Sequence, residues 1–292
     1  MLQHKVSPGL RPTRVVVIGA GGFVGGALVH CLEQEKTPVV AVSRQDVDLL
    51  EPDAEIYFSQ LLTEDDSVVF AAAEAPCKDP EMLIRNIAMM TPLLRTIQKL
   101  KPRHVVYLSS DAVYLDSDRP LNESSPAAPG SLHGAMHLSR ELMIASVCAD
   151  NLCIVRPTLI YGDADPHNGY GPNRFRRLVA QGKEVVLFGN GEEKRDHVSI
   201  DDVTELLRRI IWSQSVGILN IATGTVLSFR EIAQALIENT TGDSIIGTSA
   251  RFGPMPHNGY RAFDPLATYR AFPDFQYRQF LEVVGTQAGS GQ

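Results

Sequence analysis

Short runs of β-branched residues alternate with longer stretches of helical periodicity along the first half of the chain. The runs expected to form strands are residues 15–18, 39–42, 68–72, 104–108 and 152–155. Between them the pattern predicts helices over residues 25–34, 80–99 and 133–149. Strands that alternate with helices in this way are typical of an α/β fold with a doubly wound parallel sheet.

A glycine-rich turn follows the first predicted strand and precedes a helical run. Gly19, Gly22 and Gly25 stand three residues apart, with Phe23 and Val24 between the last two. The first glycine permits a tight turn, the second lets the backbone approach a pyrophosphate, and the third lets the helix pack on the strand. The N–H groups at the helix start then hold the anion. This segment predicts a dinucleotide-binding Rossmann domain rather than an unspecific turn.

The regular alternation ends after Arg156-Pro157, where residues 161–172 are rich in Gly, Pro, Asn and Asp. We therefore expect two domains. The Rossmann domain is predicted to comprise residues 11–160 plus about 196–222, and a smaller α/β substrate-binding cap to comprise residues 161–195 plus about 223–284. Residues 1–10 and 285–292 are expected to be disordered.

Composition narrows the class of protein. The chain has 292 residues, 44% of them hydrophobic, and a formal net charge of −7. An acidic balance without a basic face argues against nucleic-acid binding, and no apolar run approaches the roughly 20 residues of a membrane span. The four cysteines have no CxxC spacing, so we expect neither disulfides nor structural zinc, and a cytoplasmic location.

With these patterns in place, the chain resembles the extended short-chain dehydrogenase/reductase family, which includes nucleotide-sugar epimerases, dehydratases and reductases. The matching motifs occur in order over nearly the whole chain: the glycine turn, the alanines 71–73, Asn86, and the segments 106–114, 156–162, 171–173, 187–191 and 195–203. The resemblance implies further cofactor contacts at Ala71, Ala72, Ala73, Asn86, Ser109 and Pro157. It implies substrate contacts at Asp111, Tyr114, Tyr161, Asn173, Arg195 and Arg251, with Arg261 as an alternative to Arg251.

The family's catalytic centre combines a Ser or Thr with a Tyr and a Lys spaced as YxxxK. Ser110 fits the first position, four residues before Tyr114, but His133 and His137 stand where the family has Tyr and Lys. An imidazole titrates near neutrality, so we expect His133 to act as acid or base and His137 to bind the nicotinamide ribose. Without the fixed positive charge, His133 should serve better as a base in alcohol oxidation than as an acid in reduction.

Three other interpretations of the histidine pair stay open. Histidines four apart on a helix can bind zinc, but Gly134 replaces the glutamate of HExxH and no third ligand is evident, so we expect no metal. In a second interpretation the site has lost its catalytic activity, and the protein binds a dinucleotide as a sensor or scaffold. The third interpretation is two ordinary polar residues on a helix rim.

Cofactor preference depends on the end of the second predicted strand. Ser43 stands where NAD-preferring relatives have an acid, and Arg44 is suited to pair with a 2′-phosphate. Asp48 and Leu49 resemble the pair that lies beside the adenine in the family. We therefore favour NADP, with NAD as the alternative.

Together these residues predict an NAD(P)-dependent sugar-nucleotide epimerase or ketoreductase that acts by hydride transfer. Asp111 matches the acid of the 4,6-dehydratases, but Ala112 replaces their glutamate, which disfavours dehydration. The expected partner is a nucleotide sugar or a similar small molecule. A homodimer is expected through the predicted helices 80–99 and 133–149.

Overall fold

The computed structural model describes residues 2–7, 10–166, 168–240 and 243–289, and the chain forms two compact units. The first comprises Met1–Leu115, Glu123–Pro157 and Val203–Ile221. The second comprises Asp116–Asn122, Thr158–Asp202 and Ala222–Gln292. Residues 116–122 and 196–202 were expected in the first domain and belong to the second. Residues 196–199 are part of a strand that pairs only with strands of the second unit.

The first unit is built on a seven-stranded sheet with the order β1-β10-β6-β5-β4-β2-β3. The strands are β1 Gln3–His4, β2 Arg14–Ile18, β3 Val39–Val42, β4 Asp66–Phe70, β5 His104–Leu108, β6 Leu152–Pro157 and β10 Ser215–Ile221. Every neighbouring pair is parallel except β1 with β10. The predicted parallel Rossmann sheet is therefore confirmed, and its central strands are buried along nearly their whole length.

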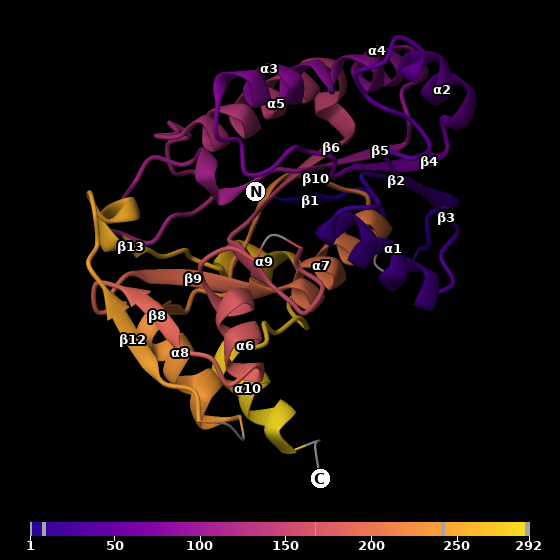
Figure 1. Ribbon diagram of the computed structural model, residues 1–292. Coiled ribbons are helices and arrows are strands. Elements are labelled where there is room, and N and C mark those ends of the chain that lie inside the picture. Colours follow the sequence, from indigo (N-terminus) through magenta and orange to yellow (C-terminus); the bar gives the residue numbers. More distant parts are fainter. Residues whose placement is uncertain (1, 8–9, 167, 241–242, 290–292) are drawn as a thin grey trace. The chain divides into compact units, whose positions relative to one another are not determined.

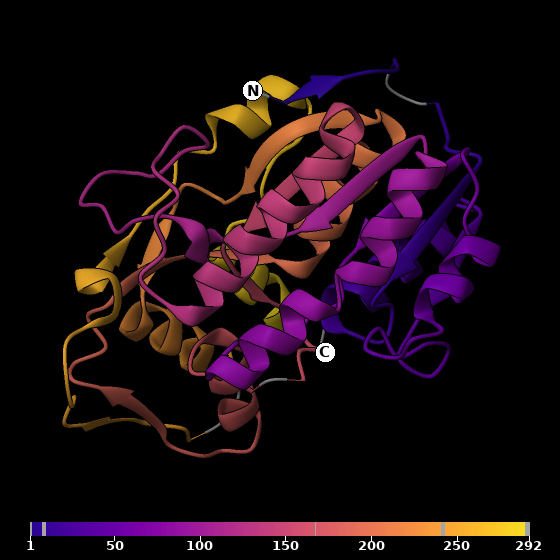
Figure 2. The same ribbon diagram turned by 90° about the horizontal axis from the view of Figure 1, so that it is seen from above.

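Helices cover both faces of this sheet (Figure 1). On one face lie α1 Phe23–Gln34 and α7 Ile200–Trp212; on the other lie α2 Ala54–Leu61, α3 Pro80–Ala88, α4 Thr91–Leu100 and α5 Leu132–Cys148. Helix α5 packs against both α3 and α4, and α4 packs against α2, so the second group forms one layer (Figure 2). The 3₁₀ turns are η1 Asp111–Val113 and η2 Ala149–Asn151.

Two predictions differ from the structure, and helix α2 is an element that was not predicted. The single helix expected over residues 80–99 is two helices, because α4 starts afresh with Pro92 in its first turn and proline lacks the N–H that a continuing helix needs. The segments expected to be disordered contain strand β1 and the end of helix α10, while residues 1, 8–9 and 290–292 lie outside the described residues.

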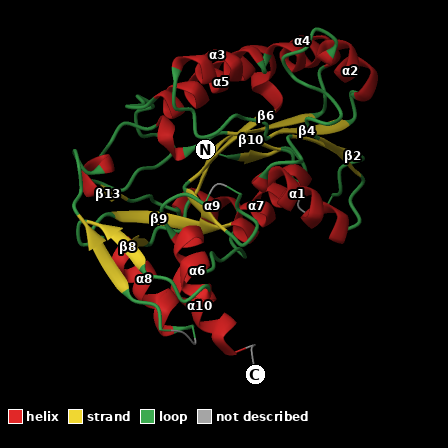
Figure 3. Ribbon diagram, in the orientation of Figure 1, coloured by secondary structure: helices red, strands yellow, loops and turns green. Residues whose placement is uncertain are grey.

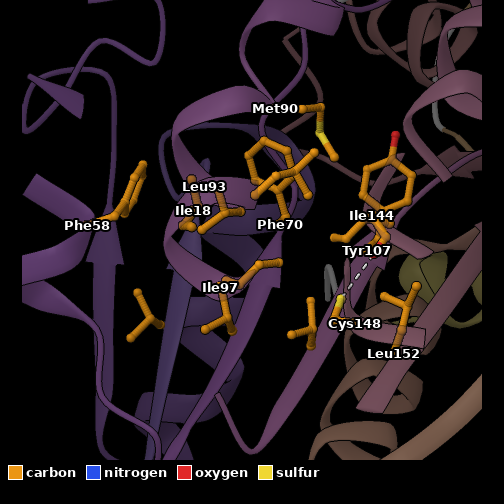
Figure 4. Close-up of a cluster of buried hydrophobic side chains, with 14 of the residues drawn as sticks. Ile18, Phe58, Phe70, Met90, Leu93, Ile97, Tyr107, Ile144, Cys148 and Leu152 are labelled. Atoms are coloured by element: carbon orange, nitrogen blue, oxygen red, sulfur yellow. Dashed lines mark hydrogen bonds between the residues drawn. The ribbon is translucent and has the colours of Figure 1, made fainter. Parts of the chain in front are cut away.

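Between the sheet and the α2–α5 layer lies the main hydrophobic core (Figure 4). Strands contribute Ile18, Phe70 and Tyr107, helices contribute Phe58, Leu93, Ile97, Ile144 and Cys148, and the turn between α3 and α4 contributes Met90. Tyr107 is 1% exposed, and Figure 4 shows its hydroxyl pointing away from the apolar side chains. The Tyr107 hydroxyl is therefore a buried polar group that needs a hydrogen-bond partner.

The second unit combines small sheets with helices (Figure 3). Its strands are β7 Leu159–Tyr161, β8 Val185–Phe188, β9 Lys194–Ser199, β11 Val226–Ser228, β12 Ile246–Ser249 and β13 Tyr260–Arg261, and its helical elements are α6 Pro172–Ala180, α8 Phe229–Glu238, η3 Pro256–Gly259, α9 Leu266–Ala271 and α10 Phe280–Gly289. Strand β9 pairs with β7, β11 and β13, and β8 pairs with β12. Ser228 and Glu231 form a capping box that starts α8. In the part of the chain that the structure describes, no helix is both long and apolar enough to cross a bilayer.

Candidate cofactor and catalytic site

The turn between β2 and α1 and the first turn of α1 leave no room for a side chain at Gly19 or Gly25. Gly19 has φ +95°, and a Cβ there would lie 2.5 Å from the amide nitrogen of Ala72. A Cβ on Gly25 would lie 2.2 Å from the carbonyl oxygen of Gly19. Only glycine permits both approaches. The turn therefore has the shape that a pyrophosphate cradle at a helix N-terminus requires.

A pocket of about 470 Å³ opens beside this turn, within the first unit. Its lining includes nine residues predicted to bind the cofactor: Gly19, Gly22, Ser43, Arg44, Asp48, Leu49, Ala71, Ala72 and Ala73. It also includes Gly21, Gln45, Val47, Glu74 and Met89, which the motifs did not single out. The carboxyl ends of β2, β3 and β4 meet here, where ligands bind in open parallel sheets. The residues present thus fit a dinucleotide.

The segment after β3 carries two carboxylates, Asp48 in the pocket lining and Asp46 hydrogen-bonded to the lining residue Ser43. Asp46 accepts hydrogen bonds from the Ser43 backbone N–H (2.8 Å) and hydroxyl (2.7 Å). Asp48 accepts from the Leu50 N–H (3.0 Å) and lies 3.2 Å from the exposed Arg44 guanidinium. These hydrogen bonds, led by the backbone ones, lower the pKa of both Asp46 and Asp48. Both carboxylates are therefore charged at neutral pH.

Asn86 supports the pocket from behind. It is fully buried, its Oδ1 accepts from the Glu74 N–H (3.0 Å), and its Nδ2 donates to the carbonyls of Glu74 (3.0 Å) and Met82 (2.9 Å). The Glu74 carboxylate pairs with Arg85 at 2.7 Å. The side-chain amide is thus hydrogen-bonded within the chain and holds the pocket-lining Glu74, while its predicted direct contact with a cofactor stays a prediction.

The start of α5 packs unusually close to the turn η1. A Cβ on Gly134 would lie 2.0 Å from the Ala112 carbonyl oxygen, so only glycine allows this approach. The Ser131 hydroxyl caps the helix by accepting from the Gly134 N–H at 3.1 Å. The approach brings His133 within electrostatic range of Asp111, whose charge opposes the lowering of the His133 pKa. Nothing in the sequence pattern pointed to Gly134 as the residue that joins the two segments.

Both signature histidines lie at this junction. The ring of His133 is half-buried, and its Nδ1 accepts from the Cys77 N–H at 3.4 Å. His137 is 5% exposed, and its Nδ1 lies 2.9 Å from the Tyr107 hydroxyl. The ring centroids are 4.8 Å apart, edge to face. Burial lowers the pKa of both rings, that of His137 further because His133 and Arg140 are near. Both imidazoles are therefore neutral at pH 7.

Ser110 is the N-cap of η1, the turn that α5 contacts, whereas the hydroxyls of Ser109 and Tyr114 have partners in the interior. Ser110 Oγ accepts from the Ala112 N–H at 3.2 Å and is 3.4 Å from the Asp111 carboxylate. The Ser109 hydroxyl donates to Glu141 (2.5 Å), and that of Tyr114 donates to Asn220 (2.7 Å). Each hydroxyl donates to a buried partner and keeps its acceptor lone pairs, so the predicted ligand contacts of Ser109 and Tyr114 stay predictions.

Glu141 connects these interior groups, and its replacement makes a stability prediction. Its carboxylate accepts two hydrogen bonds from Arg156 (2.9 and 2.5 Å) in addition to the one from Ser109, and both ion-pair side chains are 4% exposed. Glu141→Gln leaves the Arg156 charge without a counter-ion, so we expect the free energy of unfolding to fall by about 2 kcal/mol. Urea unfolding followed by the fluorescence of the single tryptophan measures it. Asp65→Asn, at an exposed ion pair, should leave stability nearly unchanged; equal effects of the two would contradict the prediction.

Four predicted substrate residues lie in the second unit. Tyr161 is buried against Phe280, and the Asn173 amide accepts from the Gly162 N–H (2.9 Å) and donates to Asp165 (2.9 Å). Both therefore shape the loop after β7 from inside. Arg195 and Arg251 share the buried carboxylate of Glu193, at 3.2 and 3.5 Å. Two guanidinium groups on one carboxylate leave a local excess of positive charge.

The remaining predicted residues have simple positions. Phe23 and Val24 are the first residues of helix α1, and Pro157 is the last residue of β6. None of the three belongs to the lining of the pocket. Asp111 is buried in η1. Arg261 is 2% exposed and lies 2.8 Å from Asp116. No group of three or more potential metal ligands occurs among the described residues.

Comparisons with known proteins agree with this geometry. The family model described as "NAD dependent epimerase/dehydratase family" matches residues 15–222. A UDP-glucose 4-epimerase of Mycolicibacterium smegmatis is 28% identical over 259 residues, which are 76% of this chain and 81% of that enzyme.

Solved structures share the fold. MoeE5 in complex with UDP-glucose and NAD superposes with a TM-score of 0.79 at 24% identity, covering 94% of this chain and 97% of that one. A GDP-L-fucose synthetase of Naegleria fowleri bound to NADP superposes with a TM-score of 0.79 at 19% identity, covering 98% and 96%. The family match spans most of the chain, the glycine turn and the pocket included. This chain belongs to the NAD-dependent epimerase/dehydratase family, whose resemblance the motifs predicted.

Proposed function

We propose that this protein transfers hydride to and from a nucleotide sugar or a similar polyol, as an epimerase or ketoreductase. Its family supports an NAD-dependent enzyme of the epimerase or reductase type. The observation that carries the proposal is a link within the first unit: Arg140, on the helix of both histidines, donates from Nη2 to the carbonyl of the pocket-lining Ala72 at 2.7 Å. Helix α5 is thus tied to the wall of the pocket.

When bound, a nicotinamide dinucleotide supplies the hydride acceptor or donor. The backbone N–H groups around Gly19 and Gly22 hold its pyrophosphate. Ser110 donates a hydrogen bond to the reacting oxygen of the sugar, and His133 exchanges a proton with that oxygen. Arg195 and Arg251, in the second unit, are suited to bind a diphosphate, because guanidinium forks match phosphate oxygens.

The contact between His133 and Cys77 affects which proton transfers are easy. While Nδ1 accepts the Cys77 N–H, the neutral ring carries its proton on Nε2 and offers a hydrogen-bond donor. For Nε2 to act as a base, the proton must move to Nδ1 and the Cys77 contact must be given up. At 3.4 Å that contact is long, so its loss is a small cost.

The same contact favours a second candidate function, a dinucleotide-binding sensor or scaffold without turnover. A pair of neutral imidazoles in which Nε2 starts protonated can bind an oxygen without exchanging its proton. The two functions separate when purified protein is incubated with NAD(P) and a panel of nucleotide sugars. Product analysis must accompany absorbance, because net epimerisation recycles the cofactor. New sugar products support the enzyme, and dinucleotide binding without any product supports the sensor.

We propose NADP as the preferred cofactor, with NAD as the alternative. The Arg44 side chain is 77% exposed, and its exposed pair with Asp48 is weak enough to exchange for a 2′-phosphate. Asp46 works in the other direction, because its carboxylate at Ser43 repels a phosphate and accepts hydrogen bonds from free ribose hydroxyls. The preference therefore depends on Arg44.

Replacing Arg44 tests this preference. We expect Arg44→Ala to weaken NADPH binding about tenfold or more and to leave NADH binding unchanged, since a charge-assisted contact to the 2′-phosphate is lost. Calorimetric titration of both dinucleotides measures the difference, with Arg103→Ala as an exposed arginine elsewhere in the unit. Equal losses for NADPH and NADH would reject the role of Arg44.

We also propose a cytoplasmic homodimer. The exposed apolar side chains of Ile84 on α3 and Leu142 on α5, 68% and 66% exposed, give the expected helices an apolar surface for a second copy.

A further inference from the structure

His137, which stands at the position of the family's lysine, is hydrogen-bonded to Tyr107 of the hydrophobic core. Tyr107 stands on β5 with its ring among apolar side chains and its hydroxyl pointing away from them (Figure 4). That hydroxyl lies 2.9 Å from Nδ1 of His137. Among the described residues, this is the only hydrogen bond of the Tyr107 hydroxyl and the only one of the His137 ring.

The direction of this hydrogen bond follows from burial. Burial raises the pKa of Tyr107 to about 12, so the phenol keeps its proton at neutral pH. If Nδ1 were the donor, the buried O–H of Tyr107 would lack an acceptor among the described residues, which is destabilising. If Tyr107 donates, both groups are satisfied. Tyr107 is therefore the donor and Nδ1 the acceptor.

The charge state of His137 decides which ring nitrogen carries its proton. Burial, the neighbouring His133 and the Arg140 guanidinium all lower the pKa of His137, so the ring carries one proton. Arg140 is itself buried, has no carboxylate partner in the described part of the chain, and lies 5.4 Å above the Tyr107 ring. A fixed cation there disfavours a second proton on His137. With Nδ1 accepting, the single proton is on Nε2.

We propose that Tyr107 is a positioning residue that fixes the tautomer of His137, so that the ring presents Nε2–H as a neutral hydrogen-bond donor to a ligand oxygen. Nε2 of His137 has no partner among the described residues, so it is available for this contact. A second nitrogen held by a buried partner is the usual means by which proteins choose a histidine tautomer. The proposal rests on the proposed function only in naming the ligand, a dinucleotide whose ribose hydroxyls accept the bond.

The positive charge of the missing lysine is then replaced by two groups. His137 supplies the hydrogen-bond donor without a charge, and Arg140, one turn further along α5, supplies the charge beneath the pocket wall at Ala72. A neutral donor cannot lower the pKa of a neighbouring acid or base as an ammonium does. His137 therefore acts by hydrogen bonding, and its ring is neutral at pH 7 and above.

Nitrogen NMR of the free protein tests the tautomer directly. In protein labelled with ¹⁵N-histidine, long-range ¹H–¹⁵N correlations distinguish a protonated from an unprotonated ring nitrogen, and the signals of His137 are those lost in His137→Gln. We expect Nδ1 unprotonated and Nε2 protonated in the wild type, and a mixture of tautomers in Tyr107→Phe. Tyr277→Phe is the matched control, because it removes a buried hydroxyl that bonds to Thr268 and Ala222 in the second unit; it should leave the His137 pattern unchanged.

A wild-type His137 protonated on Nδ1 would overturn the proposal, and so would an unchanged tautomer in Tyr107→Phe. The second readout is calorimetric titration with NADPH and NADH, for which Tyr107→Phe should bind about threefold to tenfold more weakly than the wild type and Tyr277→Phe equally well. A tautomer shift without any loss of affinity would overturn the contact with the ligand. If the wild type binds neither dinucleotide, the proposed function fails while the NMR result still decides the tautomer.

Discussion

Gly25→Ala is expected to abolish dinucleotide binding. The new Cβ would lie 2.2 Å from the carbonyl oxygen of Gly19 and 2.8 Å from its carbonyl carbon. Both atoms belong to backbone that also closes on Ala72, so neither can move aside without opening the turn. Because the pyrophosphate is held by N–H groups of this turn, a small shift removes several hydrogen bonds at once.

Calorimetric titration with NADPH and NADH measures this effect, and thermal unfolding reports how much the fold is weakened. Gly130→Ala is the control, because a Cβ at Gly130 meets nothing within 4 Å. We expect it to bind dinucleotide as the wild type does. Wild-type affinity in Gly25→Ala would mean that the turn is not the pyrophosphate cradle.

Five of the seven strands of the sheet could be predicted because they are runs of apolar residues, whereas β1 and β10 were not predicted. The ranges 39–42 and 104–108 agree with β3 and β5 residue for residue, and the other three overlap their strands. A strand buried between two helical layers leaves an uninterrupted apolar run, which is easy to recognise. Helix α2 and the division between α3 and α4 were harder. Helix α2 has only eight residues, and Pro92 ends one helical pattern while starting another with the same periodicity.

Motifs located the segments of the site better than the roles of their side chains. The pocket lining contains most of the residues expected around the glycine turn and strand ends. Asn86, Ser109 and Tyr114 also occur in the expected segments, but each has a polar partner distant in sequence, 12 residues away for Asn86, 32 for Ser109 and 106 for Tyr114. Such pairings depend on the folded backbone, so a local motif contains no sign of them.

Tyr107 and Gly134 have roles in the structure that no motif predicted. Tyr107 reads as one more apolar position of a buried strand, and only the fold places its hydroxyl at His137. Gly134 was noted as the residue that replaces a zinc-site glutamate, whereas the structure gives it the role of letting α5 touch η1. A glycine inside a helix destabilises it by roughly 0.5–1 kcal/mol relative to alanine, so its presence indicates some structural need without saying which segment it contacts.

His133→Ala is expected to lower turnover about a hundredfold to ten-thousandfold while leaving dinucleotide binding nearly unchanged. The loss is the usual contribution of a general acid or base. Binding is expected to persist because His133 is absent from the pocket lining. His30→Ala, an exposed histidine of α1, is the control for loss of an imidazole and should keep full turnover.

The pH dependence separates chemistry by His133 from a structural role. Burial holds the pKa of His133 below its ordinary value of 6.5, with Asp111 opposing. Alcohol oxidation needs the neutral ring, so its rate should be constant above pH 7 and fall as the pH drops through the lowered pKa. Ketone reduction needs the protonated ring and should decrease as the pH rises through the same value. His133→Ala should remove both dependences.

The most direct test of the account is therefore sugar product formed per bound dinucleotide, compared between the wild type and His133→Ala under equal saturation with cofactor. We expect product from the wild type, a loss of at least a hundredfold in His133→Ala, and equal dinucleotide affinity in both. Equal turnover in the two proteins, or cofactor binding by the wild type with no product from any nucleotide sugar, would contradict it.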